Sequence, residues 1–166
     1  FEKPIYVNFD ETICAHSRNK INGCSRCLDV CPAGAIKSMG DHVDVDPGIC
    51  GGCGLCGAVC PSGATQTAYP PSDQLLSEIA RLLEYYTEAG GKNASLLLHD
   101  ASYGFELIEV MARYGRGLPA HVLPVSMHAV GRAGHDLIVG AIALGYHQVF
   151  ILLNPNKPAE NEPLIA

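Results

Sequence analysis

The sequence predicts two structural units in one chain: an α+β unit over residues 1–70, followed by a small α/β unit with a parallel sheet over residues 71–166. The first observation behind this prediction is that all eight cysteines fall within the first 60 residues. The second is that helical and strand-like apolar patterns alternate in the later part of the chain, which is typical of βαβ units. Hydrophobic residues make up 48% and charged residues 17%, so the composition argues against wholesale disorder.

Charge and hydropathy exclude two classes of function. Asp and Glu number 17 against 11 Lys and Arg, and a formal charge of -6 without a basic stripe makes a poor nucleic-acid binder. The longest apolar stretch, residues 137–153, is interrupted by glycines and polar residues, so we expect no membrane span. No signal-peptide pattern is present. Because the chain begins with Phe1 and stops abruptly at Ala166, we expect a fragment of a longer polypeptide.

The strongest motif is a run of four cysteines that ends in a proline, namely Cys50, Cys53, Cys56 and Cys60 with Pro61. Bacterial proteins use this C-x2-C-x2-C-x3-C-P spacing for cubane iron–sulfur clusters, whereas zinc sites rarely use four cysteines so spaced. Three thiolates two residues apart curl around three irons, and the fourth, before the proline, points to a second cluster. The intervening glycines let backbone N–H groups approach the cluster sulfides and stabilise their negative charge.

An imperfect copy of this motif, Cys24, Cys27 and Cys31, lies 29 residues before the last three cysteines of the run. The position that corresponds to the run's first cysteine holds Ile21, so one ligand is missing from the copy. Cys14 is the remaining thiol and would complete the motif if a nine-residue loop is inserted, which costs little because loop entropy rises slowly with length. The alternative is that Cys14 is a free thiol and that the first site holds a three-iron cluster or none.

With these two motifs, residues 5–69 resemble the two-cluster 4Fe–4S ferredoxins. The resemblance implies an α+β ferredoxin-like fold, electron transfer, and two 4Fe–4S clusters with crossed ligation. One cluster would be held by Cys14, Cys24, Cys27 and Cys60, and the other by Cys31, Cys50, Cys53 and Cys56. Because so small a unit lacks a large core, the clusters themselves would hold it together.

Short strands and helices are expected around the cysteines. Residues 35–38 and 42–45 flank a turn and predict a β-hairpin. Residues 4–9 and 65–69 are expected to form an outer strand pair, and two short helices are expected to follow the cysteine runs.

The cysteine-free part predicts a βαβαβ order. Two prolines within residues 69–73 indicate the boundary, and Ser72 or Asp73 is expected to cap the next helix. The expected elements are a helix from residue 75 to the glycines at 90 and 91, a strand at 95–99, a helix at 101–114, a strand at 120–126, a helix at 132–144 and a strand at 148–153.

Ligands of parallel sheets bind at the carboxyl ends of the strands, and the sequence offers weak candidates there. The chain has neither a dinucleotide fingerprint nor a P-loop. Residues 131–134, which precede a helix, admit two interpretations: an anion site with Arg132, or the one we favour, a loop cap with an exposed arginine.

The histidines are weaker candidates still. Convergence of His99, His128 and His135 on a metal, and a ligand role for His16 near a cluster, are both less favoured than structural roles. Three others are expected at exposed strand edges: His42, His121 and His147.

Residues 125–132 and 138–150 resemble the delta subunit of methyl-viologen-reducing hydrogenases, over residues 93–155 in all. That family has a small cysteine-rich domain with a 2Fe–2S cluster and links a hydrogenase or formate dehydrogenase to heterodisulfide reductase. Its cysteines are absent here, where comparable places hold His99, Ser102, Ser126 or Met127, and Asn154. Because such a cluster needs thiolates, we expect this half to serve as a docking or structural domain.

We therefore expect an electron-transfer module of a larger oxidoreductase, more a carrier than a catalyst, in the reducing cytoplasm. Its partners would be redox proteins or other domains of a longer parent chain, and Asp41, Asp44 and Asp46 would steer a basic partner or form a solvated hairpin. One alternative is an enzyme subunit whose α/β half binds a flavin or another small ligand. Another is an interaction module built on zinc. Disulfides are disfavoured because cysteines two residues apart bridge poorly and nothing indicates export.

Overall fold

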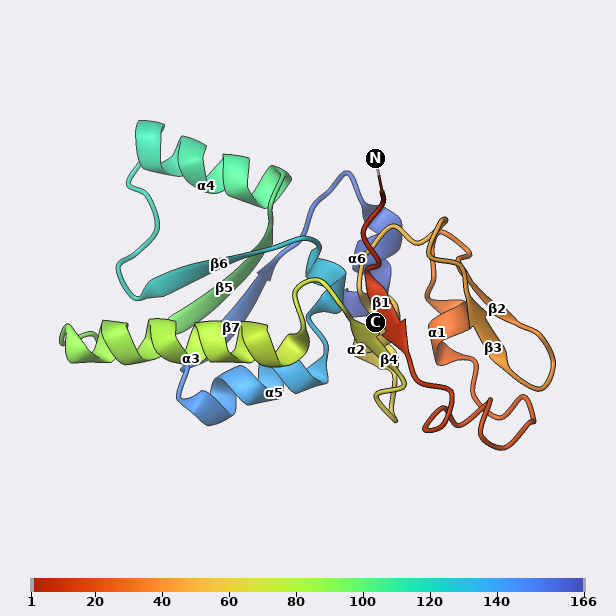
Figure 1. Ribbon diagram of the computed structural model, residues 1–166. Coiled ribbons are helices and arrows are strands. Elements are labelled where there is room, and N and C mark those ends of the chain that lie inside the picture. The colour runs from red at the N-terminus through yellow and green to blue at the C-terminus, as the bar shows by residue number, and fades with distance from the viewer. Residues whose placement is uncertain (1, 166) are drawn as a thin grey trace.

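A computed structural model describes residues 2–165, and its ribbon separates into a cysteine half and a sheet half (Figure 1). We use these names for residues 2–70 and 71–165. The predicted boundary at residues 69–73 spans the end of the connection from the last strand of the cysteine half and the first turn of the helix that opens the sheet half. No helix among the described residues is long and apolar enough to cross a membrane.

The cysteine half consists of two antiparallel strand pairs and two short helices. The strands are β1 (Val7–Phe9) paired with β4 (Thr65–Thr67), and β2 (Ile36–Ser38) paired with β3 (Val43–Val45). The hairpin and the outer strand pair thus lie where the sequence predicted them. Its core is small and consists of three buried cysteines with Ile36, Val43 and Ala64.

The two helices of this half are α1 (Arg26–Asp29) and α2 (Leu55–Val59), and both lie inside the cysteine runs instead of following them. The prediction of helices after the runs was therefore wrong in position. Gly54 has a left-handed φ of 80° and turns the chain into α2 directly after Cys53. Cys60 is extended because the residue before a proline avoids the helical region, so α2 ends before the fourth cysteine.

The sheet half is built on a three-stranded parallel sheet in the order β6-β5-β7, as the alternating pattern predicted. The strands are β5 (Ser95–Asp100), β6 (Val122–Met127) and β7 (Gln148–Leu152). The helices are α3 (Ser72–Glu88), α4 (Tyr103–Tyr114), α5 (His135–Leu144) and α6 (Pro158–Ile165), with a 3-10 turn, η1, at Val130–Arg132. In Figure 1, α3 and α5 cover one face of the sheet and α4 lies on the other.

The core of this half lies between the sheet and the α3–α5 layer. Leu96 and Leu98 of the central strand are fully buried, as is Ile79 of α3. The expected cap of α3 was wrong: Pro71 is the N-cap residue, neither Ser72 nor Asp73 makes a side-chain cap, and both lie in the first turn. An extended proline is pre-organised for this position, since a helix start lacks N–H partners in any case.

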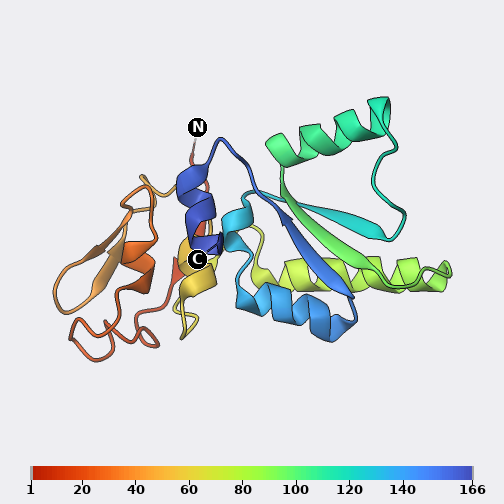
Figure 2. The ribbon, with the colours of Figure 1, turned by 180° about the vertical axis from the view of Figure 1, so that it is seen from behind.

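Helix α6 returns the chain to the cysteine half. After β7 the chain crosses to α6, which packs against η1 and lies beside α2 (Figure 2). This helix was not expected from the sequence, and it gives the sheet half a second segment next to the cysteines.

Candidate functional site

The eight cysteines, all within the described residues, are free thiols, and they gather in two groups. In the first, burial, together with the charges of Cys60, Cys14 and Cys24, raises the pKa of the Cys27 thiol to about 11. This group therefore takes three cysteines from the early part of the chain and Cys60 from the far end of the second motif.

The second group is completed by a cysteine of the first motif. Burial, together with the charges of Cys53, Cys50 and Cys31, raises the pKa of the Cys56 thiol to about 12. The thiol charges thus act on one another within the same two sets of four that the resemblance to the ferredoxins implies. Both groups offer thiols alone as donors, which is the donor chemistry that cubane iron–sulfur clusters require.

A cavity of about 270 Å³ lies at the second group and is lined by all four of its cysteines. The rest of its wall is apolar except for Glu160, and includes Val7, Ala35, Ile36 and Val45. A cavity walled by four thiols and aliphatic side chains fits a compact inorganic cluster that must be kept from water.

At the first group, Cys14 belongs to the same buried cluster as Cys27, and Ile21, which the repeat alone would put there, does not. The Cys14 side chain is buried beside Cys27 in the small core, whereas Ile21 is 62% exposed. The intervening loop makes this possible because it folds back through His16, which is fully buried. His16 Nδ1 lies 3.3 Å from the Cys24 carbonyl and Nε2 lies 3.0 Å from the Gly40 carbonyl, so its ring ties the loop to the hairpin.

Cys60 differs from the other thiols in its hydrogen bonds. Burial raises its pKa, but hydrogen bonds from Thr65 and Ser62 outweigh burial and lower the pKa to about 7. Thr65 contributes mainly through its backbone N–H, because its hydroxyl donates to the Cys56 carbonyl at 2.8 Å. A lower pKa favours the thiolate, which is the form that binds metal.

Close packing at three glycines joins the sheet half to the second cysteine motif. A Cβ on Gly131 would lie 2.7 Å from the Cys53 carbonyl oxygen, and one on Gly54 would lie 2.4 Å from Cβ of Arg132. A Cβ on Gly134 would lie 2.8 Å from Cα of Ala58. Only glycine lets the backbone of η1 sit directly on the cysteine peptide.

The expectation of an exposed Arg132 was wrong, since only 8% of the residue is exposed. Its guanidinium donates to the Pro70 carbonyl at 2.9 Å and to the Ser72 hydroxyl at 3.5 Å. Arg132 therefore stabilises the connection between the halves and is not a free anion-binding group. The sequence showed only that an arginine precedes a helix, because its partners lie about sixty residues away.

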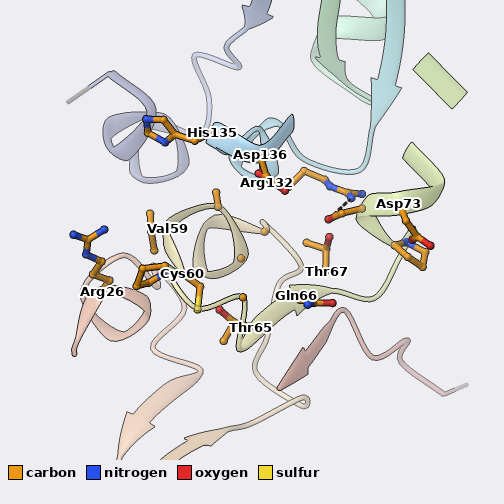
Figure 3. Close-up of a pocket in the computed structure, with 17 residues that line it drawn as sticks. Arg26, Val59, Cys60, Thr65, Gln66, Thr67, Asp73, Arg132, His135 and Asp136 are labelled. Atoms are coloured by element: carbon orange, nitrogen blue, oxygen red, sulfur yellow. Dashed lines mark hydrogen bonds between the residues drawn. The ribbon is translucent and has the colours of Figure 1, made fainter. Parts of the chain in front are cut away.

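A cleft of about 690 Å³ lies around α2, between the cysteine half and the starts of α3 and α5 (Figure 3). Cys60, Thr65 and Thr67 line it on one side, and His135 on the other. Its two arginines, Arg26 and Arg132, are offset by two acids, Asp73 and Asp136. The charge of the cleft therefore selects neither an anion nor a cation.

The histidines proposed as weak candidates do not converge. His99 is buried with Nδ1 2.9 Å from the Asp100 carbonyl, His128 stacks on Tyr6 with ring centroids 5.1 Å apart, and His135 faces the cleft. Within residues 2–165, no group of three or more His, Cys, Asp or Glu is arranged to hold a single metal ion. The three expected surface histidines are exposed.

A buried polar network at the carboxyl edge of the sheet was missed from the sequence. Asn154 Nδ2 donates to Asp100 Oδ2 at 2.6 Å, and Gly104 N donates to Oδ1 at 2.7 Å. Burial raises the Asp100 pKa, but these hydrogen bonds outweigh burial and hold the pKa below its usual value. Asn161 of α6 donates to the Asn154 carbonyl at 2.7 Å, so the network also ties α6 to the sheet.

Comparison with known proteins places the cysteine motifs in a defined class. A family model described as a 4Fe–4S dicluster domain matches residues 20–64, a segment that contains every cysteine except Cys14. A domain of this class implies at least one 4Fe–4S cluster and electron transfer. No curated protein and no solved structure matches the chain. The resemblance of residues 93–155 to a hydrogenase delta subunit accordingly has no support from these comparisons.

Proposed function

We propose that the chain transfers electrons through two 4Fe–4S clusters as a module of a larger oxidoreductase. One cluster is held by Cys14, Cys24, Cys27 and Cys60, and the other by Cys31, Cys50, Cys53 and Cys56. The observation that carries this proposal is the gathering of eight free thiols into two groups of four, each completed by a cysteine from the other motif.

When bound, each cluster supplies a site that accepts and releases one electron at a time. The residues of the chain hold it, exclude water and set its surroundings. Aliphatic side chains line the second cavity, so a charge added there meets a low dielectric. Hydrogen bonds to Cys60 from Thr65 and Ser62 favour the thiolate at the first site.

We place the module in the cytoplasm, because a reducing compartment keeps thiols available for clusters. Its partners are redox proteins or other domains of a longer parent chain. The sheet half serves as a structural or docking domain, and its close packing on the second cysteine motif supports the structural part of this role.

Anaerobic purification with iron and sulfide analysis tests the proposal. We expect brown protein with about eight irons per chain, bleached by dithionite. Zinc without sulfide would overturn the proposal in favour of an interaction module. A flavin band released by denaturation would instead favour the enzyme-subunit alternative.

A cysteine variant tests the assignment of the first site. In C14S we expect iron to fall from about eight toward about seven or four per chain, with the second cluster intact. S17A is a suitable control in the same loop, because Ser17 carries no thiol and its hydroxyl oxygen accepts a hydrogen bond from the Val43 N–H. Full iron content in C14S would show that Cys14 is not a ligand.

A further inference from the structure

The cavity at the second cysteine group has a single charged side chain on its wall. Four cysteines line it, and every other lining residue is apolar or glycine except Glu160. Glu160 belongs to α6, the last helix of the sheet half, which lies beside α2 (Figure 2). A carboxylate does not help to bind a cluster that is itself negatively charged, so its position on this wall needs another explanation.

The position of Glu160 is built into the fold. Asn161, the next residue, donates to the Asn154 carbonyl, and Asn154 in turn donates to the buried Asp100. This chain of hydrogen bonds anchors α6 to the carboxyl edge of the sheet. On its other side α6 packs against η1, whose Gly131 sits on the Cys53 carbonyl.

Only a long ion pair near the surface compensates the negative charge of Glu160. Its side chain is 21% exposed, and its ion-pair partner is Lys157, whose Nζ lies 3.5 Å from Oε2. Lys157 is the more exposed of the two, so solvent screens its charge more strongly. The Glu160 charge reaches the thiols, because after burial it is the largest factor that raises the pKa of Cys53.

We propose that Glu160 lowers the reduction potential of the cluster at Cys31, Cys50, Cys53 and Cys56 and leaves the other cluster unaffected. Reduction adds a negative charge to the cavity, and a carboxylate on an apolar wall opposes that addition. The sheet half thereby sets the potential difference between the two clusters. This inference rests on the proposed function, since it requires that the cluster is present.

Three charge variants of α6, studied in the full iron-loaded chain, test the proposal. E160Q removes the carboxylate from the wall, K157Q removes its partner, and E162Q removes an exposed carboxylate two residues further along the same helix. The reduced fraction of each cluster is followed by electron spin resonance during an anaerobic redox titration. The C14S variant identifies the signal of the second cluster.

At a fixed ambient potential we expect E160Q to raise the reduced-to-oxidised ratio of the second cluster roughly three- to tenfold. Tenfold corresponds to about 59 mV for one electron. K157Q should lower the same ratio, and E162Q should change it less than about twofold, since its charge is screened. The ratio of the first cluster should not change in any variant.

An E160Q titration that matches E162Q would overturn the inference, as would an equal shift of both clusters. A three-iron signal in E160Q would also overturn it, because Glu160 would then be a ligand and not a source of charge. Wild-type protein without iron and sulfide would instead overturn the proposed function, and this result is obtained from metal analysis before any titration.

Discussion

Replacing Gly131 with alanine should weaken the joint between the two halves and the hold on the second cluster. The new Cβ would lie 2.7 Å from the Cys53 carbonyl oxygen and 3.1 Å from Cγ of Leu55. The first contact is with backbone, which cannot swing aside as the end of a side chain can. Either η1 or the Cys53–Gly54 peptide must therefore move.

The expected cost is about 1–3 kcal/mol, the usual range for inserting a methyl group into a well-packed site. Leu55 is 1% exposed and the joint around Gly131 is buried, so the neighbourhood has little room to relax. A loss of this size is a substantial part of the total stability of a small domain. Because the displaced peptide carries Cys53, the second cluster should be lost more readily than the first.

Anaerobic denaturant titration, followed by far-ultraviolet circular dichroism and by cluster absorbance, measures both effects. G23A is a control in the cysteine half, because a Cβ there meets nothing closer than 3.9 Å and Gly23 neither has a left-handed φ nor lines the second cavity. Unfolding free energies of G131A and G23A that agree within about 0.5 kcal/mol would refute the packing argument.

Three further predictions concern other parts of the chain. H16A should cost about 1–3 kcal/mol, because it empties a fully buried position and removes the ring N–H that donates to one of the two neighbouring carbonyls, Cys24 or Gly40. It should also speed iron loss from the first site, measured by chelator challenge against the exposed control H147A. Y146F removes the hydroxyl that donates to the Ile79 carbonyl at 2.9 Å. Burial raises the Tyr146 pKa to about 12, so the free energy of unfolding of the wild type should fall as the pH rises from 10 to 12. Denaturant titration should show a smaller fall in the variant, which has no hydroxyl to ionise. Iron chelation should raise hydrogen exchange in residues 2–70 before β5–β7, whose aliphatic core does not depend on a cluster; simultaneous loss of protection would contradict this.

Sequence patterns predicted most strands and turns well, because these elements depend on interactions between residues that are neighbours in the chain. The strands β5, β6 and β7 lie within two residues of their expected bounds, since short apolar runs between glycines leave few alternatives. The hairpin around Gly40 and the left-handed glycines at 90 and 145 follow equally from neighbouring residues. Cap and helix positions were less accurate, as the start of α3 and the location of α1 and α2 show.

Contacts between distant residues were beyond the sequence patterns. The burial of Arg132 depends on the Pro70 carbonyl, and that of His16 on the Gly40 carbonyl, so neither is visible in a local window. Helix α6 was not expected because it contains Pro163 and its apolar pattern is weak. The sequence patterns therefore gave no reason to single out Glu160, whose place on the cavity wall is visible only in the structure.

The most direct test of the central claim is a crystal structure of anaerobically purified protein with anomalous scattering recorded at the iron absorption edge. We predict two compact groups of four irons, one bonded to Cys14, Cys24, Cys27 and Cys60 and the other to Cys31, Cys50, Cys53 and Cys56. A single iron group, isolated zinc ions between the thiols, or sulfurs joined in pairs would contradict the account.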